Sequence, residues 1–277
     1  MTAAIDAWQR RQEKAFGTGA PPLATTAGAE RFLERMSFAL RYNATAGLPL
    51  ASLQRAFAGD DPDKDAAAHA IALTNHLLGT MTGVEVSVIA GRIAVVHRRV
   101  MPSLYTLVRR GRPLDDLEGL SLNARTALAL LRQRKEVSAG DVRNRLGLRA
   151  DPLNDPAYAA LGELMRILLA DRGPFEIPKK GIAYLPPEGY PYHLFHEAHA
   201  DLVAAAKKLS IETAADTFLS SYFAAAAVAR VRKLASMFKQ FLSLAEIDAS
   251  LARLTDRGRI EARKAGSVVY HVWVARD

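Results

Sequence analysis

Three histidines and a glutamate supply the residue types of a metal site. His193, His196 and His199 are three residues apart, and Glu197 lies among them. In a helix this spacing places the imidazoles along one side. A zinc hydrolase needs a third firm ligand and a base, as in His-Glu-x-x-His, and the run His196–His199 is one residue short of that pattern. The spacing therefore favours a partly exposed polar helix face, and we predict neither a metal nor a cofactor.

Other catalytic signatures do not occur in the sequence. It has no Gly-x-Ser-x-Gly, no phosphate-binding Gly-x-x-x-x-Gly-Lys-[Ser/Thr] and no Gly-x-Gly-x-x-Gly behind a strand. The acid-rich run from Asp60 to Asp65 lacks the glycine and the closing glutamate of a calcium loop, so we interpret it as a helix cap. The chain contains no cysteine, which excludes disulfides and a cysteine nucleophile. We predict no catalytic residues and a protein that is not an enzyme.

Basic side chains at hairpin turns are the most specific functional signal. Lys and Arg at the tip of a hairpin can neutralise phosphates and fix the position of a protein on DNA without reading bases. Charged turns are also common on protein surfaces that bind nothing. The predicted DNA-binding residues are the turn positions and the arginines that follow the first turn: Arg92, Arg98, Arg99, Arg109, Arg110, Lys179, Lys180, Arg263 and Lys264.

The net charge supports a polyanionic partner. The chain of 277 residues carries a formal charge of +8, and residues 91–150 alone hold 13 Lys plus Arg against 5 Asp plus Glu, which is also +8. Concentrated positive charge favours nucleic acid through counterion release. No apolar run is long enough to span a bilayer, and the first 16 residues lack a signal-peptide core, so we expect a cytoplasmic, nucleoid-associated protein.

The elements that would carry these residues repeat along the chain. Helices followed by a short hairpin are predicted three times, and the turn glycines Gly91, Gly181 and Gly266 are 90 and 85 residues apart. In the last repeat, Ser243 and Glu246 form a capping-box pattern before a helix that stops at Gly258. In the middle repeat, Asp155 caps a helix that begins with Pro156, and strands are predicted at 175–177 and 182–185.

The first repeat follows the same order less clearly. Helices are predicted at 30–42, 50–58 and 65–78, followed by alternating strand residues from Val84 to Val88. The predicted fold is therefore mainly α with small β-hairpins, an α+β class, in three tandem winged-helix modules. The predicted divisions are an N-terminal helix and linker (1–28), module 1 (29–112), module 2 (113–186), a connecting helix (187–210) and module 3 (211–277).

The third helix of each repeat argues against sequence-specific reading. A helix that enters the major groove carries Arg, Lys, Asn or Gln near its start. These helices begin instead with acidic residues, among them Asp63, Asp155 and Glu246. Carboxylates suit the first turn of a helix but repel phosphate. We therefore expect binding to double-stranded DNA through its backbone, with weak sequence preference.

Two stretches resemble known families. The run from Ile247 to Ile260 and the hairpin after it resemble the recognition helix and wing of the winged-helix (helix-turn-helix) superfamily. Residues 30–185, with Gly83-Val84-Glu85-Val86, Leu120 to Leu131 and Val137 to Val142, are similar to bacterial segregation-and-condensation protein B. That resemblance implies a chromosome-organising scaffold that dimerises and binds proteins of a condensin-like complex. The sequence departs from that family because it has a third module after Ile211.

Bacterial DNA glycosylases of the crosslink-unhooking type also stack winged helices. Their catalytic motif, a glutamine followed one residue later by Gln or Asp, does not occur here, so their activity is not carried over. The sequence thus predicts a non-enzymatic DNA-binding protein in transcription regulation or chromosome maintenance. The alternatives are a condensin-type scaffold, possible as a homodimer, and a glycosylase-like or zinc enzyme.

Overall fold

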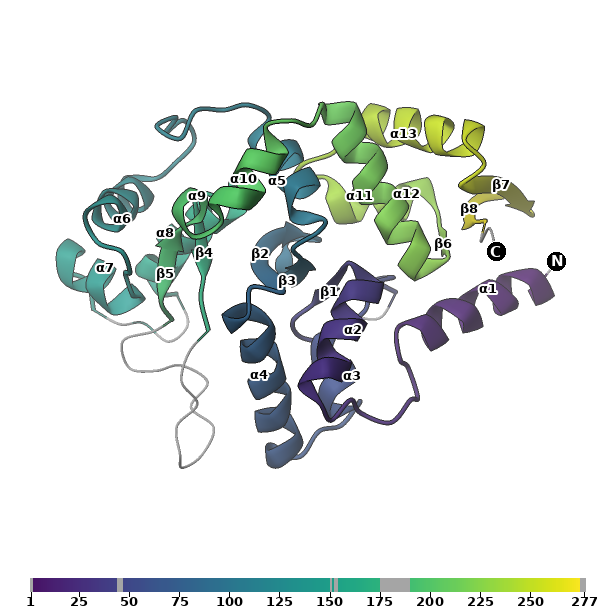
Figure 1. Cartoon of the computed structure of the whole chain (residues 1–277), viewed down its shortest axis with the longest axis horizontal. Helices are drawn as coiled ribbons and strands as arrows, with labels where there is room; N and C mark the ends of the chain where they lie inside the picture. Colours follow the sequence, from purple (N-terminus) through teal and green to yellow (C-terminus); the bar gives the residue numbers. More distant parts are fainter. Residues whose placement is uncertain (1, 44–46, 150, 152–153, 175–189, 275–277) are drawn as a thin grey trace.

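The computed structural model describes residues 2–43, 47–149, 151, 154–174 and 190–274. Helices dominate it, and its strands form small antiparallel sheets, which confirms the mainly α, α+β class. The helices and sheets follow one another along an arc, with the middle of the chain at one end and its C-terminal part at the other (Figure 1). Among the described residues, no helix is both long and apolar enough to cross a membrane.

The N-terminal part places four helices before a hairpin and one after it. A strand from Phe38 to Leu40 pairs with the second strand of that hairpin and completes a three-stranded sheet of order β1-β3-β2. The elements are α1 (Thr2–Ala15), α2 (Thr26–Met36), β1 (Phe38–Leu40), α3 (Leu53–Ala58), α4 (Lys64–Gly79), β2 (Gly83–Ile89), β3 (Arg92–His97) and α5 (Met101–Arg109).

The middle part has a two-stranded sheet whose strands are far apart in the sequence. The elements are α6 (Leu122–Gln133), α7 (Ala139–Leu146), α8 (Pro156–Arg166), β4 (Ala170–Arg172), β5 (Tyr192–Leu194), α9 (Phe195–Ala198) and α10 (Ala200–Ala206). The C-terminal part holds a three-stranded sheet of order β6-β8-β7. Its elements are α11 (Ile211–Ala226), β6 (Val228–Ala229), α12 (Val231–Phe238), α13 (Leu244–Asp256), β7 (Ile260–Ala265) and β8 (Val268–Trp273).

Local sequence signals set several helix ends. Ser243 and Glu246 form the predicted capping box at the start of α13, and Gly258 has a φ of +64° just after it. Asp155 accepts a hydrogen bond from the backbone N–H of Ala157, and Pro156 occupies the first turn of α8. These predicted caps are confirmed.

One element prediction was wrong, and another lies outside the described residues. The helix predicted at 30–42 ends at Met36, because Ser37 adopts a φ of +64° and the chain continues as β1. Phe38, Ala39 and Leu40 are all buried, so they lack the alternation by which a strand is recognised. The middle sheet is built from β4 and β5, which lie outside the predicted strands at 175–177 and 182–185; those two segments are not among the described residues.

The first and last parts of the chain share one hydrophobic core. The ring of Phe38 in β1 stacks on Phe218 of α11 at 5.0 Å between centroids, and Phe238 of α12 meets Phe218 edge-on at 5.1 Å. All three side chains are buried. The predicted modules 1 and 3 are therefore in direct contact through aromatic side chains, while the predicted boundaries themselves stay a prediction.

The N-terminal helix packs against the C-terminal sheet. Gln12 donates hydrogen bonds to the carbonyl oxygens of Ala226 and Val228, at 2.8 and 3.1 Å. Trp8 contacts Tyr270 of β8 with ring centroids 5.7 Å apart. The first and last elements of the chain therefore lie side by side (Figure 1).

Replacing Phe218 with Ala should show how far the shared core holds the molecule together. The change leaves a cavity between β1, α11 and α12, so we expect the free energy of unfolding to fall by about 3–5 kcal/mol. Urea denaturation measures this, with Val269→Ala, at a 40% exposed position of β8, as the control expected to stay within about 0.5 kcal/mol. A loss for Phe218→Ala no larger than that of the control would show that the two parts are stabilised separately.

Candidate functional site

The first hairpin presents Arg92 next to a helix of the C-terminal part. Arg92 begins β3 and is exposed. The turn before it is packed, since the backbone N–H of Ala90 donates to the carbonyl of Met237 in α12 at 2.7 Å. Arg92 therefore lies at a junction between α12 and the sheet and not on a projecting tip.

Arg98 and Arg99 follow β3 and are half exposed. Arg98 forms an ion pair with Asp201 of α10 at 2.5 Å. Arg99 donates to Ser37 Oγ at 3.1 Å and to the backbone oxygen of Glu34. Both guanidinium groups therefore have partners inside the molecule, although each keeps surface that a phosphate can reach.

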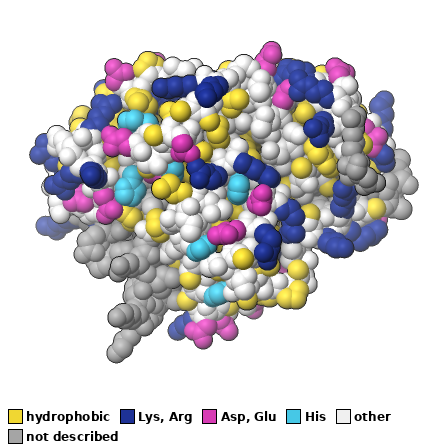
Figure 2. All heavy atoms as spheres, viewed as in Figure 1, with side chains coloured by type: hydrophobic (Ala, Val, Ile, Leu, Met, Phe, Trp, Pro, Cys, Tyr) yellow, Lys and Arg dark blue, Asp and Glu magenta, His cyan; other side chains and the backbone are white. Residues whose placement is uncertain are grey.

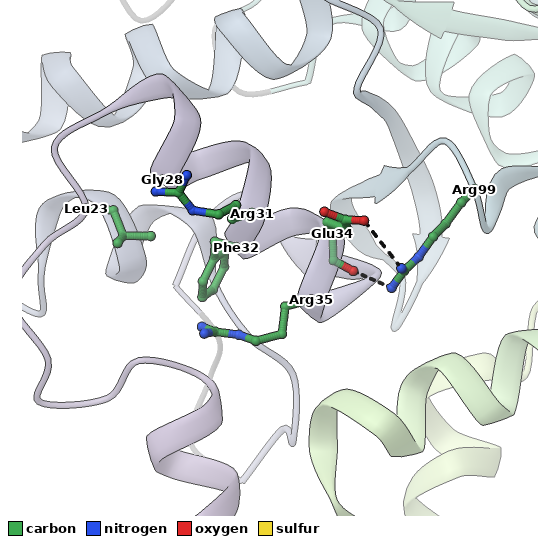
Figure 3. Close-up of a pocket in the computed structure, with 7 residues that line it drawn as sticks. All are labelled: Leu23, Gly28, Arg31, Phe32, Glu34, Arg35 and Arg99. Atoms are coloured by element: carbon green, nitrogen blue, oxygen red, sulfur yellow. Dashed lines mark hydrogen bonds and ion pairs between the residues drawn. The ribbon is translucent and has the colours of Figure 1, made fainter. Parts of the chain in front are cut away.

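A basic pocket of about 560 Å³ lies along α2 beside Arg99. Figure 3 shows Arg99 turned toward Glu34, whereas the guanidinium of Arg35 points to the opposite side. The three arginines of this pocket do not converge on one point, so we interpret it as a shelf of positive surface. Its lining residues are Leu23, Gly28, Arg31, Phe32, Glu34, Arg35 and Arg99.

Arg109 and Arg110 are used inside the protein. Arg109 is buried, and its Nη atoms donate to the carbonyl oxygens of Ile167, Arg112 and Pro113 at 3.2, 3.0 and 2.6 Å. Burial lowers the pKa of Arg109 from its ordinary value. Arg110 holds both carboxylate oxygens of Glu246, at 2.7 and 2.9 Å. These two arginines join α5 to the middle and C-terminal parts of the chain.

The last hairpin carries Arg263 and Lys264 on β7, and both are exposed. The guanidinium of Arg263 lies 6.0 Å from the ring centroid of Trp8 and forms an ion pair with Glu261. Lys179 and Lys180 lie outside the described residues. On the face in Figure 2, Lys and Arg side chains form separate groups with Asp and Glu between them.

The most strongly built polar cluster was not predicted from the sequence. Glu85, in the middle of β2, forms ion pairs with Arg41, which follows β1, and with Arg172, the last residue of β4. The three residues are 1%, 5% and 7% exposed. They bring together segments 44 and 87 residues apart in the sequence.

Charge compensation decides the ionisation of this cluster. Burial alone would raise the pKa of Glu85, but the positive charges of Arg172 and Arg41 and their hydrogen bonds outweigh it, so this pKa lies below its ordinary value. Burial likewise would lower the pKa of Arg172, and Glu85 reverses that effect and raises it. At neutral pH the cluster therefore contains two cations and one anion.

Aromatic rings cover the two arginines. The guanidinium carbon of Arg172 lies 4.0 Å from the ring centroid of Tyr190, and that of Arg41 lies 5.6 Å from Tyr190 and 5.7 Å from Tyr42. Burial raises the pKa of Tyr190. Tyr42 is 49% exposed, so its ring is at once a wall of the cluster and part of the surface.

A cavity of about 110 Å³ opens beside these residues. It is smaller than the roughly 300–1,000 Å³ of sites for drug-sized ligands, and its size suits a single planar ring system. One wall is the small-residue face of α4, and the polar groups come from the ends of β1 and α3. The lining residues are Arg41, Tyr42, Gln54, Ala67, Ala70, Ile71, Thr74 and Tyr190.

Backbone hydrogen bonds hold the segment that carries Arg41 and Tyr42. The N–H of Arg41 donates to the carbonyl of Ile93 at 2.9 Å, and its own carbonyl accepts from the N–H of Gln54 at 3.2 Å. Gln54 Oε1 accepts from the N–H of Asn43 at 3.3 Å. Gln54 thus fixes the segment through its backbone and its side chain while also lining the cavity.

This arrangement suits a nucleobase. A guanidinium donates hydrogen bonds to ring oxygens and nitrogens, a side-chain amide can both donate and accept, and a tyrosine ring stacks on a flat base. In the part of the chain that the structure describes, no cluster of three or more His, Cys, Asp or Glu could hold a metal ion.

The histidine cluster has another explanation than the predicted polar helix face. His199 is buried, and its Nε2 lies 2.6 Å from Asp171 Oδ2. His193 Nδ1 lies 3.1 Å from the carbonyl oxygen of Lys135. The prediction of partial exposure was therefore wrong for His199, which instead ties α9 and α10 to β4.

Comparison with known proteins identifies the fold. No family model and no curated protein matches the sequence. Among solved structures, the chain is similar to the Streptomyces sahachiroi DNA glycosylase AlkZ, with a TM-score of 0.56 and 12% sequence identity. The similarity covers 97% of this chain and 68% of the glycosylase. This chain therefore shares the fold of that protein.

This finding corrects three predictions. The assignment to the tandem winged-helix superfamily and the resemblance to segregation-and-condensation protein B were wrong. The structure instead matches that of a DNA glycosylase over 97% of this chain. The second resemblance had implied condensin-like partners and a dimer, and without that resemblance neither is supported. The prediction of a non-enzymatic DNA-binding protein in regulation or segregation is likewise set aside, since the neighbour is an enzyme.

Replacing Glu85 with Gln should destabilise the protein strongly. The change leaves two buried guanidinium groups without their counter-charge, and we expect the free energy of unfolding to fall by about 3–5 kcal/mol at neutral pH. The lowered pKa of Glu85 means that its contribution is complete above its ordinary value of 4.5 and is lost as the pH falls through the folded-state pKa.

Urea denaturation of the original protein and the Glu85→Gln variant, at about pH 7 and about pH 3.5, measures this loss. The difference between the two proteins should shrink in acid. Glu34→Gln is the matched control, because Glu34 is exposed and 3.9 Å from Arg99, so its removal should cost less than about 1 kcal/mol. Equal effects at the two positions would contradict the assignment of Glu85 as the central charge.

Proposed function

We propose that the protein is an enzyme that removes an altered base from DNA, with the cavity beside Arg41 as its base-binding pocket. The likeness to a DNA glycosylase over 97% of the chain carries this proposal. The second support is the cavity itself, which joins aromatic walls, a cation and an amide in a space for one ring system.

A base inside a duplex is out of reach, so an enzyme that acts on it turns the nucleotide out of the stack into a closely fitting pocket. Tyr42, which lines the cavity and is 49% exposed, offers a ring on which such a base can stack. Arg41 and Gln54 are then the polar side chains that meet the edge of the base. Glu85 pairs with Arg41 and positions it, and Arg172 shares that carboxylate.

The chemistry departs in one respect from that of the crosslink-unhooking glycosylases. Their motif, glutamine followed one residue later by Gln or Asp, is absent from this sequence. In this proposal the functional polar groups instead lie around Arg41-Tyr42-Asn43 after β1, and Gln54 is the glutamine that lines the cavity.

DNA would be held by exposed basic side chains. Of the positions predicted from the sequence, we retain Arg92, Arg98, Arg99, Arg263 and Lys264, because each is exposed, and we add Arg31 and Arg35 from the shelf along α2. Each small sheet among the described residues follows a group of helices, and the division of the chain at 29–112, 113–186 and 211–277 remains a proposal.

Replacing Tyr42 with Ala should impair base removal. Stacking of a base on an aromatic side chain is worth about 1–3 kcal/mol, so we expect kcat/KM to fall roughly five- to 150-fold. Single-turnover release of bases from damaged duplex DNA measures it. Leu122→Ala, at a 77% exposed position on α6, is the control and should leave the rate unchanged. Wild-type protein that releases no altered base would remove the proposed function.

Charge removal at the last hairpin tests the backbone contact. In the Arg263→Ala/Lys264→Ala double variant we expect weaker DNA binding and a smaller salt dependence, with the slope of log affinity against log salt reduced by about 0.9 for each lost phosphate contact. Fluorescence anisotropy with a labelled duplex at several salt concentrations gives both quantities. Val269→Ala on the same hairpin controls for its folding, and an unchanged slope in the double variant would exclude this hairpin from the interface.

A further inference from the structure

We propose that the cavity beside Arg41 selects uncharged bases that carry ring carbonyl groups, such as deaminated or oxidised bases, over cationic alkylated bases. This inference rests on the proposed function and names the substrate class of the same site. It is carried by the charge of the cluster and by the lack of a carboxylate among the described side chains that line the cavity.

The cluster has one positive charge in excess. Arg41 and Arg172 contribute two positive charges and Glu85 one negative charge, which leaves +1. Among the described residues that line the cavity there is no Asp or Glu. A cationic base would therefore enter a buried site of its own sign, where repulsion is poorly screened.

Arg41 is the cation that lines the cavity. Its Nη1 is held by Glu85, so the guanidinium is fixed in place at the cavity wall. Glu85 is itself shared with Arg172, so it neutralises Arg41 only in part. The guanidinium has no acceptor role, so a ring carbonyl oxygen or an unprotonated ring nitrogen is the complementary group.

The leaving-group chemistry points the same way. In hydrolysis the bond between C1′ and the base nitrogen breaks, its electron pair goes to the base, and the oxygen of water bonds to C1′. One proton of the water ends on the released base, so the products are a free base and a DNA sugar with a hydroxyl at C1′. An uncharged base leaves as an anion before it takes up that proton, and a fixed cation beside its carbonyl oxygen stabilises this charge. A cationic alkylated base leaves as a neutral molecule and gains nothing from Arg41.

The test compares duplexes that differ in one base. Each carries uracil, hypoxanthine or 8-oxoguanine as the uncharged base, or 7-methylguanine or 3-methyladenine as the cationic base, at the same position. Single-turnover release by the full-length protein should be at least about tenfold faster for one or more uncharged bases than for both cationic bases. Faster release of the cationic bases would overturn the inference and leave the proposed function standing.

Two substitutions probe the cause. Arg41→Gln should slow release of the preferred uncharged base about 10²-fold, the usual effect of losing one donor to a developing negative charge. It should not slow release of cationic bases, because it removes the excess positive charge that repels them. Gln54→Glu keeps the side-chain shape and the acceptor for the N–H of Asn43 but adds a carboxylate to the cavity wall. This variant should shift the preference toward cationic bases. It tests the inference even if the Arg41→Gln variant does not fold.

If no duplex releases a base, the proposed function fails, and calorimetric binding of free nucleosides then decides the inference alone. Deoxyinosine should bind and cationic 1-methyladenosine should not, with Gln54→Glu reversing the order. Equal binding of the two nucleosides, or a preference that neither substitution alters, would overturn the assignment of charge selection to this cavity.

Discussion

One buried carboxylate connects the structure to its candidate site. Glu85 lies in the central part of β2 and is shared by two arginines that arrive from the end of β1 and the end of β4. Because an isolated charge cannot remain buried, the three segments have to meet for any of them to fold as observed. The same contact sets the position of Arg41 and, through Tyr190, one wall of the cavity.

Aromatic packing supplies the second constraint on the arrangement. Phe38 follows α2 by two residues and stacks on α11, so the strand that leads to Arg41 is anchored in the core that the first and last parts share. A substitution that disrupts this core would therefore also displace the residues that follow β1 and line the cavity. The exposed positive side chains, by contrast, come from separate parts of the chain, and some form ion pairs at the surface, such as Arg98 with Asp201.

Much of the fold could be predicted from the sequence, because it rests on local signals. The capping box of Ser243 and Glu246, the Asp155-Pro156 helix start and the hairpins around Gly91 and Gly266 each depend on a few neighbouring residues. The candidate site could not be predicted in this way. Glu85 stands between two valines in an alternating strand, a pattern typical of a residue that faces water, and its partners are 44 and 87 residues away.

For a related reason, the sequence could not show which of the chosen basic residues have partners inside the protein. A row of arginines such as Arg109 and Arg110 has the same local appearance whether it faces solvent or the interior, and Arg109 in fact satisfies three backbone carbonyls. The shared use of Glu85 has an evolutionary consequence. Loss of one of the three side chains leaves a buried charge without its partner and destabilises the protein. Joint replacement of all three by apolar residues of similar volume can leave the stability nearly unchanged. Positions 41, 85 and 172 should therefore change together among descendants of this sequence: single replacements should be rare, and replacement of the whole set should be tolerated.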